Sequence, residues 1–175
     1  MIGYPRYNDL ISHPAQTALA GVTQWTLRQI RTTGIVVPHL ANSDVFSVVI
    51  QLNHAKQQGT PVKSFHIHYM PVASANGTIV FDYAWGFYVK DSVIPDTLPN
   101  TGSNTLTLAT TDQYKHKIFN IIEDLPVGAE TYSGLLLIKI TRNGGTCGPS
   151  NEIALLSHDC HILIDRLGSV NEYTD

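Results

Sequence analysis

Alternation of apolar and polar side chains over residues 64–71 constrains the fold of this chain more than any other feature. Read at a period of two, this segment has an apolar face and a mostly polar face: Phe65, Ile67 and Tyr69 against His66, His68 and Met70. Such a pattern is typical of a β-strand with a different environment on each side. The sequence therefore predicts a strand here, with its apolar face turned towards a core.

A second strand is predicted over residues 78–89, after a connection that contains Asn76-Gly77. Asn-Gly is a strong signal for a tight β-hairpin, so we expect the two strands to pair with each other. One face of the return strand is large and apolar or aromatic: Ile79, Phe81, Tyr83, Trp85, Phe87 and Val89. The other face carries Val80, Asp82, Ala84, Gly86 and Tyr88. We expect this hairpin to form the centre of the core, with a close neighbour against its small residues.

Further segments with strand character follow one another at fairly even spacing. They are residues 24–31 (a strand or a short helical turn), 45–52, 105–110, 117–123, 131–142 and 152–165. The sequence of residues 53–59 predicts one turn of helix. The sequence of residues 90–104 predicts a long connection between strands. The sequence contains no long amphipathic helical pattern.

These segments predict a single all-β domain over residues 1–175. We expect an antiparallel β-sandwich, jelly-roll-like, over residues 22–175. Residues 1–21 contain glycine and proline without clear periodicity, and they predict an extended N-terminal arm.

Composition limits the partners of the chain. Charged residues make up 14% of its 175 residues, against about 25% in an average soluble domain. The formal net charge is -3 and the Lys and Arg residues form no run, so we expect no nucleic-acid partner. No apolar stretch reaches the roughly 20 residues that span a bilayer, and the first residues lack a secretory signal, so we expect no membrane partner. Cys147 and Cys160 are isolated, which favours synthesis in a reducing cytoplasm.

A pair of histidines two residues apart is the first candidate site. The rings of His66 and His68 lie on one side of the predicted strand, as two ligands of a β-barrel metal site do. Further histidines could complete a ligand set: His116, His158 and His161. A cupin, however, follows its H-x-H within a few residues by a glutamate ligand, and here no acidic residue precedes Asp82. We therefore expect structural histidines, no metal and no cofactor, with His66, His68 and His161 as weak candidate ligands only.

Residues 157–161 (Ser-His-Asp-Cys-His) are the second candidate site. On a strand, His158 and Cys160 point to one side while Asp159 and His161 point to the other, so the four cannot act together without a bulge. The sequence has no P-loop, no G-x-G-x-x-G and no G-x-S-x-G motif. We expect no catalytic residues and no enzyme activity.

Two sets of motifs resemble those of small β-rich structural proteins in the virions of tailed bacteriophages. Residues 51–60 (Q-L-N-H-A-K-Q-Q-G-T) and 65–71 (F-H-I-H-Y-M-P) resemble that group's Q-L-P-H…K-E-G-T and P-H-I-H-W. Residues 157–161, 165–169 (D-R-L-G-S) and 172–173 (E-Y) are similar to its D-x-H-Y…D-x-x-G-S…E-Y. The resemblance covers roughly residues 45–175, and the chain departs from it at Asn53, Phe65, Tyr69 and Ile162.

The resemblance implies a structural protein of the virion. We expect a capsid decoration or cement protein, made in the host cytoplasm, that binds the major capsid protein or another virion protein. A head-fibre, collar or receptor-binding module of the same virion is the first alternative, and a small cupin-like metal-dependent enzyme is the second. The run Leu135-Leu136-Leu137-Ile138 is apolar on both faces, which predicts either a central strand or a strand beneath a neighbouring subunit. With the low charge it leads us to expect a homotrimer, held to the capsid by the arm of residues 1–21.

Overall fold

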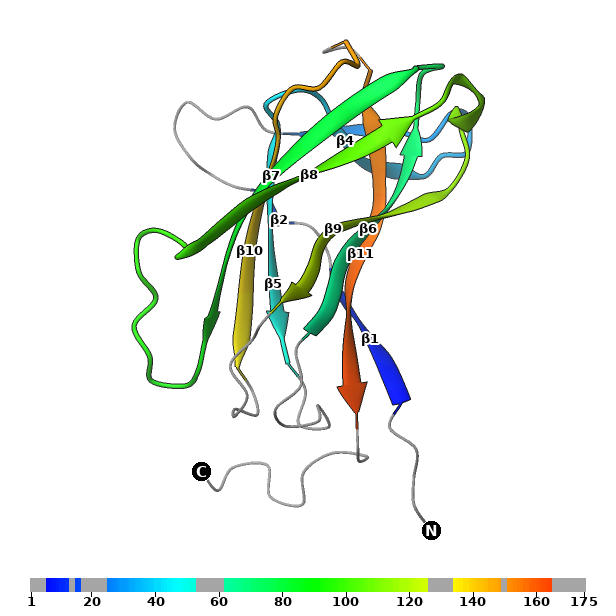
Figure 1. The fold of residues 1–175 in the computed structure, drawn as a ribbon. Coiled ribbons are helices and arrows are strands. Elements are labelled where there is room, and N and C mark those ends of the chain that lie inside the picture. Colours follow the sequence, from blue (N-terminus) through cyan, green and yellow to red (C-terminus); the bar gives the residue numbers. More distant parts are fainter. Residues whose placement is uncertain are drawn as a thin grey trace.

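Two antiparallel β-sheets face each other in the computed structural model of the chain (Figure 1). The structure describes residues 6–12, 15–16, 25–52, 62–125, 134–148 and 151–164. Sheet A has the strand order β3-β4-β11-β6-β9, with β1 also paired to β11, and sheet B has the order β2-β5-β10-β7-β8. The strands are β1 (Arg6–Ser12), β2 (Ala15–Gln16), β3 (Thr26–Gln29), β4 (Val36–Leu40), β5 (Val45–Gln51), β6 (Val62–Pro71), β7 (Gly77–Tyr88), β8 (Asn100–Leu108), β9 (Lys117–Leu125), β10 (Leu135–Arg142) and β11 (Ile153–Ile164).

The order of β4 to β11 is that of a jelly roll. Within sheet A these strands run 4-11-6-9, and within sheet B they run 5-10-7-8, so the chain passes back and forth between the sheets. Two four-stranded sheets connected in this way are the double Greek key of jelly-roll domains. The predicted antiparallel, jelly-roll-like sandwich is confirmed. Among the described residues, no helix has the length and apolar character needed to cross a membrane.

Most of the predicted strand segments are strands, with adjusted ends. The segment 24–31 contains β3, not a helical turn, and β8 begins at Asn100, so the connection after β7 is shorter than expected. Within the segment predicted as an arm, β1 pairs with β11 and β2 pairs with β5. The helical turn predicted at residues 53–59 lies outside the described residues, as do residues 1–5 and 165–175.

The predicted hairpin between residues 64–71 and 78–89 is wrong, although both segments are strands. β6 lies in sheet A between β11 and β9, whereas β7 lies in sheet B between β10 and β8. The Asn-Gly pair therefore marks a crossing between the sheets. Gly77 has a φ of 143°, and a Cβ there would lie 2.6 Å from Oγ1 of Thr146. The glycine is required by its positive φ and by this close approach, not by a two-residue turn.

The core lies between the inner faces of the two sheets. It contains the apolar face predicted for each of the two strands, including Phe65, Ile67, Tyr69, Ile79, Phe81 and Trp85. β10 is central in sheet B, between β5 and β7. Its Leu136 and Ile138 are buried in the core, and Leu135 and Leu137 are half-buried on the outer face. The central position of β10 explains why its sequence is apolar on both faces.

A buried arginine connects the two sheets at the end of β10. The side chain of Arg142 is almost fully buried, and its Nη1 donates a 2.6 Å hydrogen bond to the carbonyl oxygen of Leu40 on β4. Burial lowers the pKa of Arg142, and the nearby thiol of Cys147 and carboxyl group of Asp44 act in the opposite direction. The Arg142 guanidinium thus fixes the end of β4, just before the turn into β5, to the end of β10 in sheet B. A charged group of this kind is costly to bury without hydrogen-bond partners.

We predict that Trp85→Ala lowers the free energy of unfolding by about 3–5 kcal/mol, because it leaves a cavity in the core where the indole is only 8% exposed. Urea denaturation followed by circular dichroism measures the change. The matched control is Val93→Ala, since Val93 is 87% exposed and its truncation should change stability by less than about 0.5 kcal/mol. Equal effects of the two substitutions would contradict the placement of Trp85.

Candidate metal centre

The pairing of β6 with β11 brings the candidate site together. These strands are neighbours in sheet A, and their register places Asp159 opposite His66 and His161 opposite Ser64. Because Phe65 and Ile67 face the core, the alternate residues Ser64 and His66 lie on the outer face of sheet A. Asp159 and His161 share that face with them.

A one-residue irregularity in β11 decides which residues face outward. The register with β6 shifts between Leu155 and Ser157, so that Leu155 pairs with Tyr69 but Ser157 pairs with His68. Without this bulge, His158 would lie opposite His66, and Asp159 would lie opposite Phe65 in the core. A shift of one residue exchanges the two faces of a strand. The bulge therefore places the Asp159 carboxylate among the histidines.

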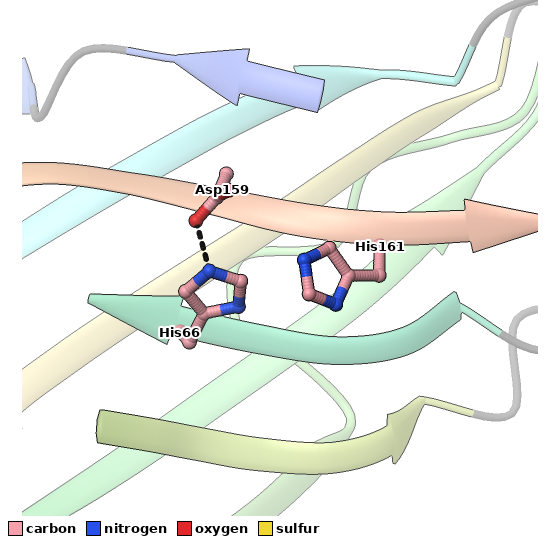
Figure 2. Close-up of side chains that lie close together, drawn as sticks. All are labelled: His66, Asp159 and His161. Carbon is pink, nitrogen blue, oxygen red and sulfur yellow. Dashed lines mark ion pairs between the residues drawn. The ribbon is translucent and has the colours of Figure 1, made fainter. Parts of the chain in front are cut away.

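Asp159 is the centre of the contacts. Its Oδ1 lies 2.5 Å from Nε2 of His66 and 3.5 Å from Nε2 of His68. The rings of His66 and His161 meet edge to face, with centroids 4.6 Å apart. Figure 2 shows His66 reaching from β6 and Asp159 and His161 from β11, all on the same side of the sheet. His66 and Asp159 are buried, and His161 is partly exposed.

Two further polar side chains orient the rings of this group. Nδ1 of His161 lies 3.4 Å from Oγ of Ser64, and Nδ1 of His68 lies 2.8 Å from Nε2 of His116. The His68 and His116 rings are also stacked. In both His161 and His68 the hydrogen bond uses Nδ1. The Nε2 atom of each ring is therefore directed towards Asp159, because the two nitrogens of an imidazole point apart.

The structure separates the second candidate motif as the sequence predicts. His158 and Cys160 face the core, where the His158 ring lies 5.8 Å from that of Phe65. Burial raises the pKa of the Cys160 thiol, and the neighbouring carboxylate of Asp159 raises it further. A thiol held in its protonated form is a poor nucleophile, so Cys160 does not have the character of a catalytic cysteine.

Sequence reasoning identified the histidines but not their carboxylate partner. No acidic residue follows His68 closely along the chain, whereas Asp159 reaches His66 across a strand pair. A second pair of this kind was also missed: Nδ1 of His39 lies 3.3 Å from Oε2 of Glu152, which also accepts a 2.8 Å bond from Arg28. Only knowledge of the strand pairing could have found either contact.

Three side chains have the geometry and chemistry of a metal-ligand set. One ligand atom each from His66, Asp159 and His161 lie within 4.8 Å of one another. Two imidazoles and a carboxylate form a ligand set for borderline divalent ions such as Zn²⁺. The same residues, without an ion, form a charged hydrogen-bonded group that joins the central strands of sheet A.

A shallow groove lies on the outer face of sheet B, on the opposite side of the molecule from the histidine cluster. Its volume is about 490 Å³, and it lies over β7, β8 and β10. Its lining is small, hydroxyl-bearing or charged: Asp82, Tyr83, Ala84, Thr101, Gly102, Ser103, Lys139 and Thr141. Asp82 already accepts a hydrogen bond from the side chain of Asn143. These groups offer hydrogen bonds to a polar ligand.

Comparison with known proteins adds little. No family model and no curated protein matches the sequence. Among solved structures, the structure of this chain is similar to the structure of TmCBM61 in complex with β-1,4-galactotriose. The sequence identity is 10% and the TM-score is 0.27. The similarity covers 81% of this chain and 88% of that chain. A likeness at this TM-score carries no argument about this protein.

We predict that Cys160 of the folded protein reacts with iodoacetamide far more slowly than it does in urea. The reason is that only the thiolate is alkylated, and burial raises the pKa of this thiol and excludes the reagent. Peptide mapping by mass spectrometry after timed labelling at pH 8 measures the two rates. Rapid labelling of Cys160 in the folded protein would contradict its inward orientation on β11.

Proposed function

We propose that the chain is a structural protein of a tailed-bacteriophage virion, a decoration or cement protein that binds the head shell as a homo-oligomer. Two observations support this proposal. Of the residues that carry the resemblance to such virion proteins, residues 65–71 and 157–161 lie on the adjacent strands β6 and β11, and His66, His68, Asp159 and His161 contact one another there. The chain also has an apolar surface at one end of sheet A that suits a protein contact.

That apolar surface carries the proposal. Leu27 on β3 pairs in register with Pro38 on β4, so Leu27, Val36 and Pro38 lie on the same side of the sheet as the core residue Leu40. Leu27 is nevertheless 62% exposed and Val36 55% exposed. The β3–β4 end of sheet A therefore extends beyond the cover of sheet B. We call Leu27, Ile35 and Val36 the apolar overhang, since Ile35 beside them is 59% exposed.

An exposed apolar group on an edge strand favours binding to another protein. All four residues of β3 are exposed, and β3 ends the strand order of sheet A. Edge strands of monomeric proteins are commonly protected by charge, and exposed apolar patches mark contact sites. The low content of charged residues, 14%, agrees with a surface that is partly covered in the virion. We assign the contact to the overhang instead of residues 1–21, because β1 is a strand of sheet A.

A receptor-binding or collar module of the same virion is the second candidate. The hydroxyl-lined groove on the outer face of sheet B favours it, because such groups can bind a polar receptor. The number of copies in each particle separates the two functions. A decoration protein coats the shell, whereas fibres and collars occupy few positions.

We predict that purified virions of the phage that encodes the chain contain it in an amount comparable with the major capsid protein. Quantitative mass spectrometry of purified particles measures the ratio. A content of a few copies for every hundred capsid subunits would favour the fibre or collar function. Particles without the chain would contradict both virion functions.

The contact surface has its own test. We predict that the double variant Leu27→Asp/Val36→Asp binds shells stripped of the chain at least about tenfold more weakly, because each carboxylate would have to be desolvated in the contact. Co-sedimentation with the shells measures binding. Val93→Asp is the matched control, since Val93 is an equally apolar, exposed residue outside the overhang. Unchanged binding of the double variant would contradict the role of the overhang.

A further inference from the structure

We propose that His66, Asp159 and His161 form a binding site for one Zn²⁺ ion, which joins β6 to β11 on the outer face of sheet A. The sequence led to the expectation of no metal because no acidic residue follows His68 closely. The strand pairing changes that premise, since Asp159 takes the place of the missing acid.

The distances suit a single small ion after a modest adjustment. Ligand atoms of the three residues lie within 4.8 Å of one another, and Nε2 of His66 and Oδ1 of Asp159 are 2.5 Å apart. Around a tetrahedral Zn²⁺ with bonds of about 2.0–2.1 Å, neighbouring ligand atoms are about 3.3 Å apart. The ion would therefore separate His66 from Asp159 by about 1 Å and draw His161 inward by at most about 1.5 Å. Rotation of the side chains supplies shifts of this size while the strands stay in place.

The ligand types select the class of ion. Calcium and magnesium ions prefer oxygen ligands throughout, whereas two imidazole nitrogens with one carboxylate favour Zn²⁺ and related transition ions. A fourth position would remain for water or for His68, whose Nε2 already lies 3.5 Å from Oδ1 of Asp159.

The surroundings of the cluster resemble those of metal-binding histidines. Such histidines commonly use their second ring nitrogen in a hydrogen bond that fixes the ring. Nδ1 of His161 lies 3.4 Å from Oγ of Ser64, and Figure 2 shows the other nitrogen of His161 directed towards His66 and Asp159. Ser64 is therefore a positioning residue, which acts on the ion through His161.

A bound Zn²⁺ ion would balance the negative charge of the buried Asp159 carboxylate. Asp159 and His66 are both buried, and a buried carboxylate needs a positive partner or several hydrogen bonds. The ion would provide that charge without requiring a protonated imidazole. It would connect the two central strands of sheet A and so add to the stability of the jelly roll.

The test is a calorimetric titration of untagged, EDTA-treated protein with zinc chloride. We expect one ion per chain, and a rise in melting temperature of about 5–10 °C at a free concentration one hundred times the dissociation constant. Asp159→Asn and His161→Gln should each weaken binding at least tenfold, and Ser64→Ala by about tenfold. His39→Gln is the matched control, because His39 on sheet A also faces a carboxylate, that of Glu152 just before β11. It should bind zinc as the wild type does.

A second measurement keeps the proposal testable if a variant fails to fold. In the wild-type chain, zinc should shift the NMR signals of the His66 and His161 rings and leave those of His39 and His158 unchanged. The absence of binding to the wild type would overturn the proposal. So would binding that survives both Asp159→Asn and His161→Gln, or shifts confined to histidines outside the cluster.

Discussion

The register between β6 and β11 is the constraint on which the rest of the structure depends. A single extra residue between Leu155 and Ser157 turns Asp159 outward and Cys160 inward. In the alternative register the carboxylate would lie opposite Phe65, where burial without a partner is costly. The bulge thus keeps Cys160 and Ile162 on the core side of β11 with Ile153 and Leu155. It also creates the only group among the described residues in which two histidines and a carboxylate could hold an ion.

The period-two pattern was sufficient to predict β6 and β7 and the core-facing side of each, but β4 was not predicted. Phe65, Ile67 and Tyr69 face the core, and so do Phe81 and Trp85, because alternation is a local property that each strand carries in its own sequence. Pairing is not local. Asn76-Gly77 has the composition of a hairpin turn, but Gly77 serves a crossing against Thr146, some seventy residues away. The Asp159 contact was missed for the same reason, since neither the partner of β11 nor its bulge is visible in the sequence.

Sheet A thus has two distinct regions, one on its outer face and one on its inner face. Over β6 and β11 it carries a polar group that holds the central strands together. At β3 and β4 the inner face is exposed, and the apolar overhang has the character of a contact surface. The proposed virion role requires both properties, since a shell component must be stable by itself and must also bind its neighbours. Because the two regions lie on different strands, substitutions can change one without the other.

A double-mutant cycle between His66 and Asp159 tests the central claim most directly. His66→Ala, Asp159→Ala and the double variant are compared with the wild type by urea denaturation in EDTA. Because the two side chains are in contact across β6 and β11, the account predicts a coupling free energy of about 1–3 kcal/mol. A coupling indistinguishable from zero, with all four proteins folded, would mean that the two side chains do not meet and would contradict the register.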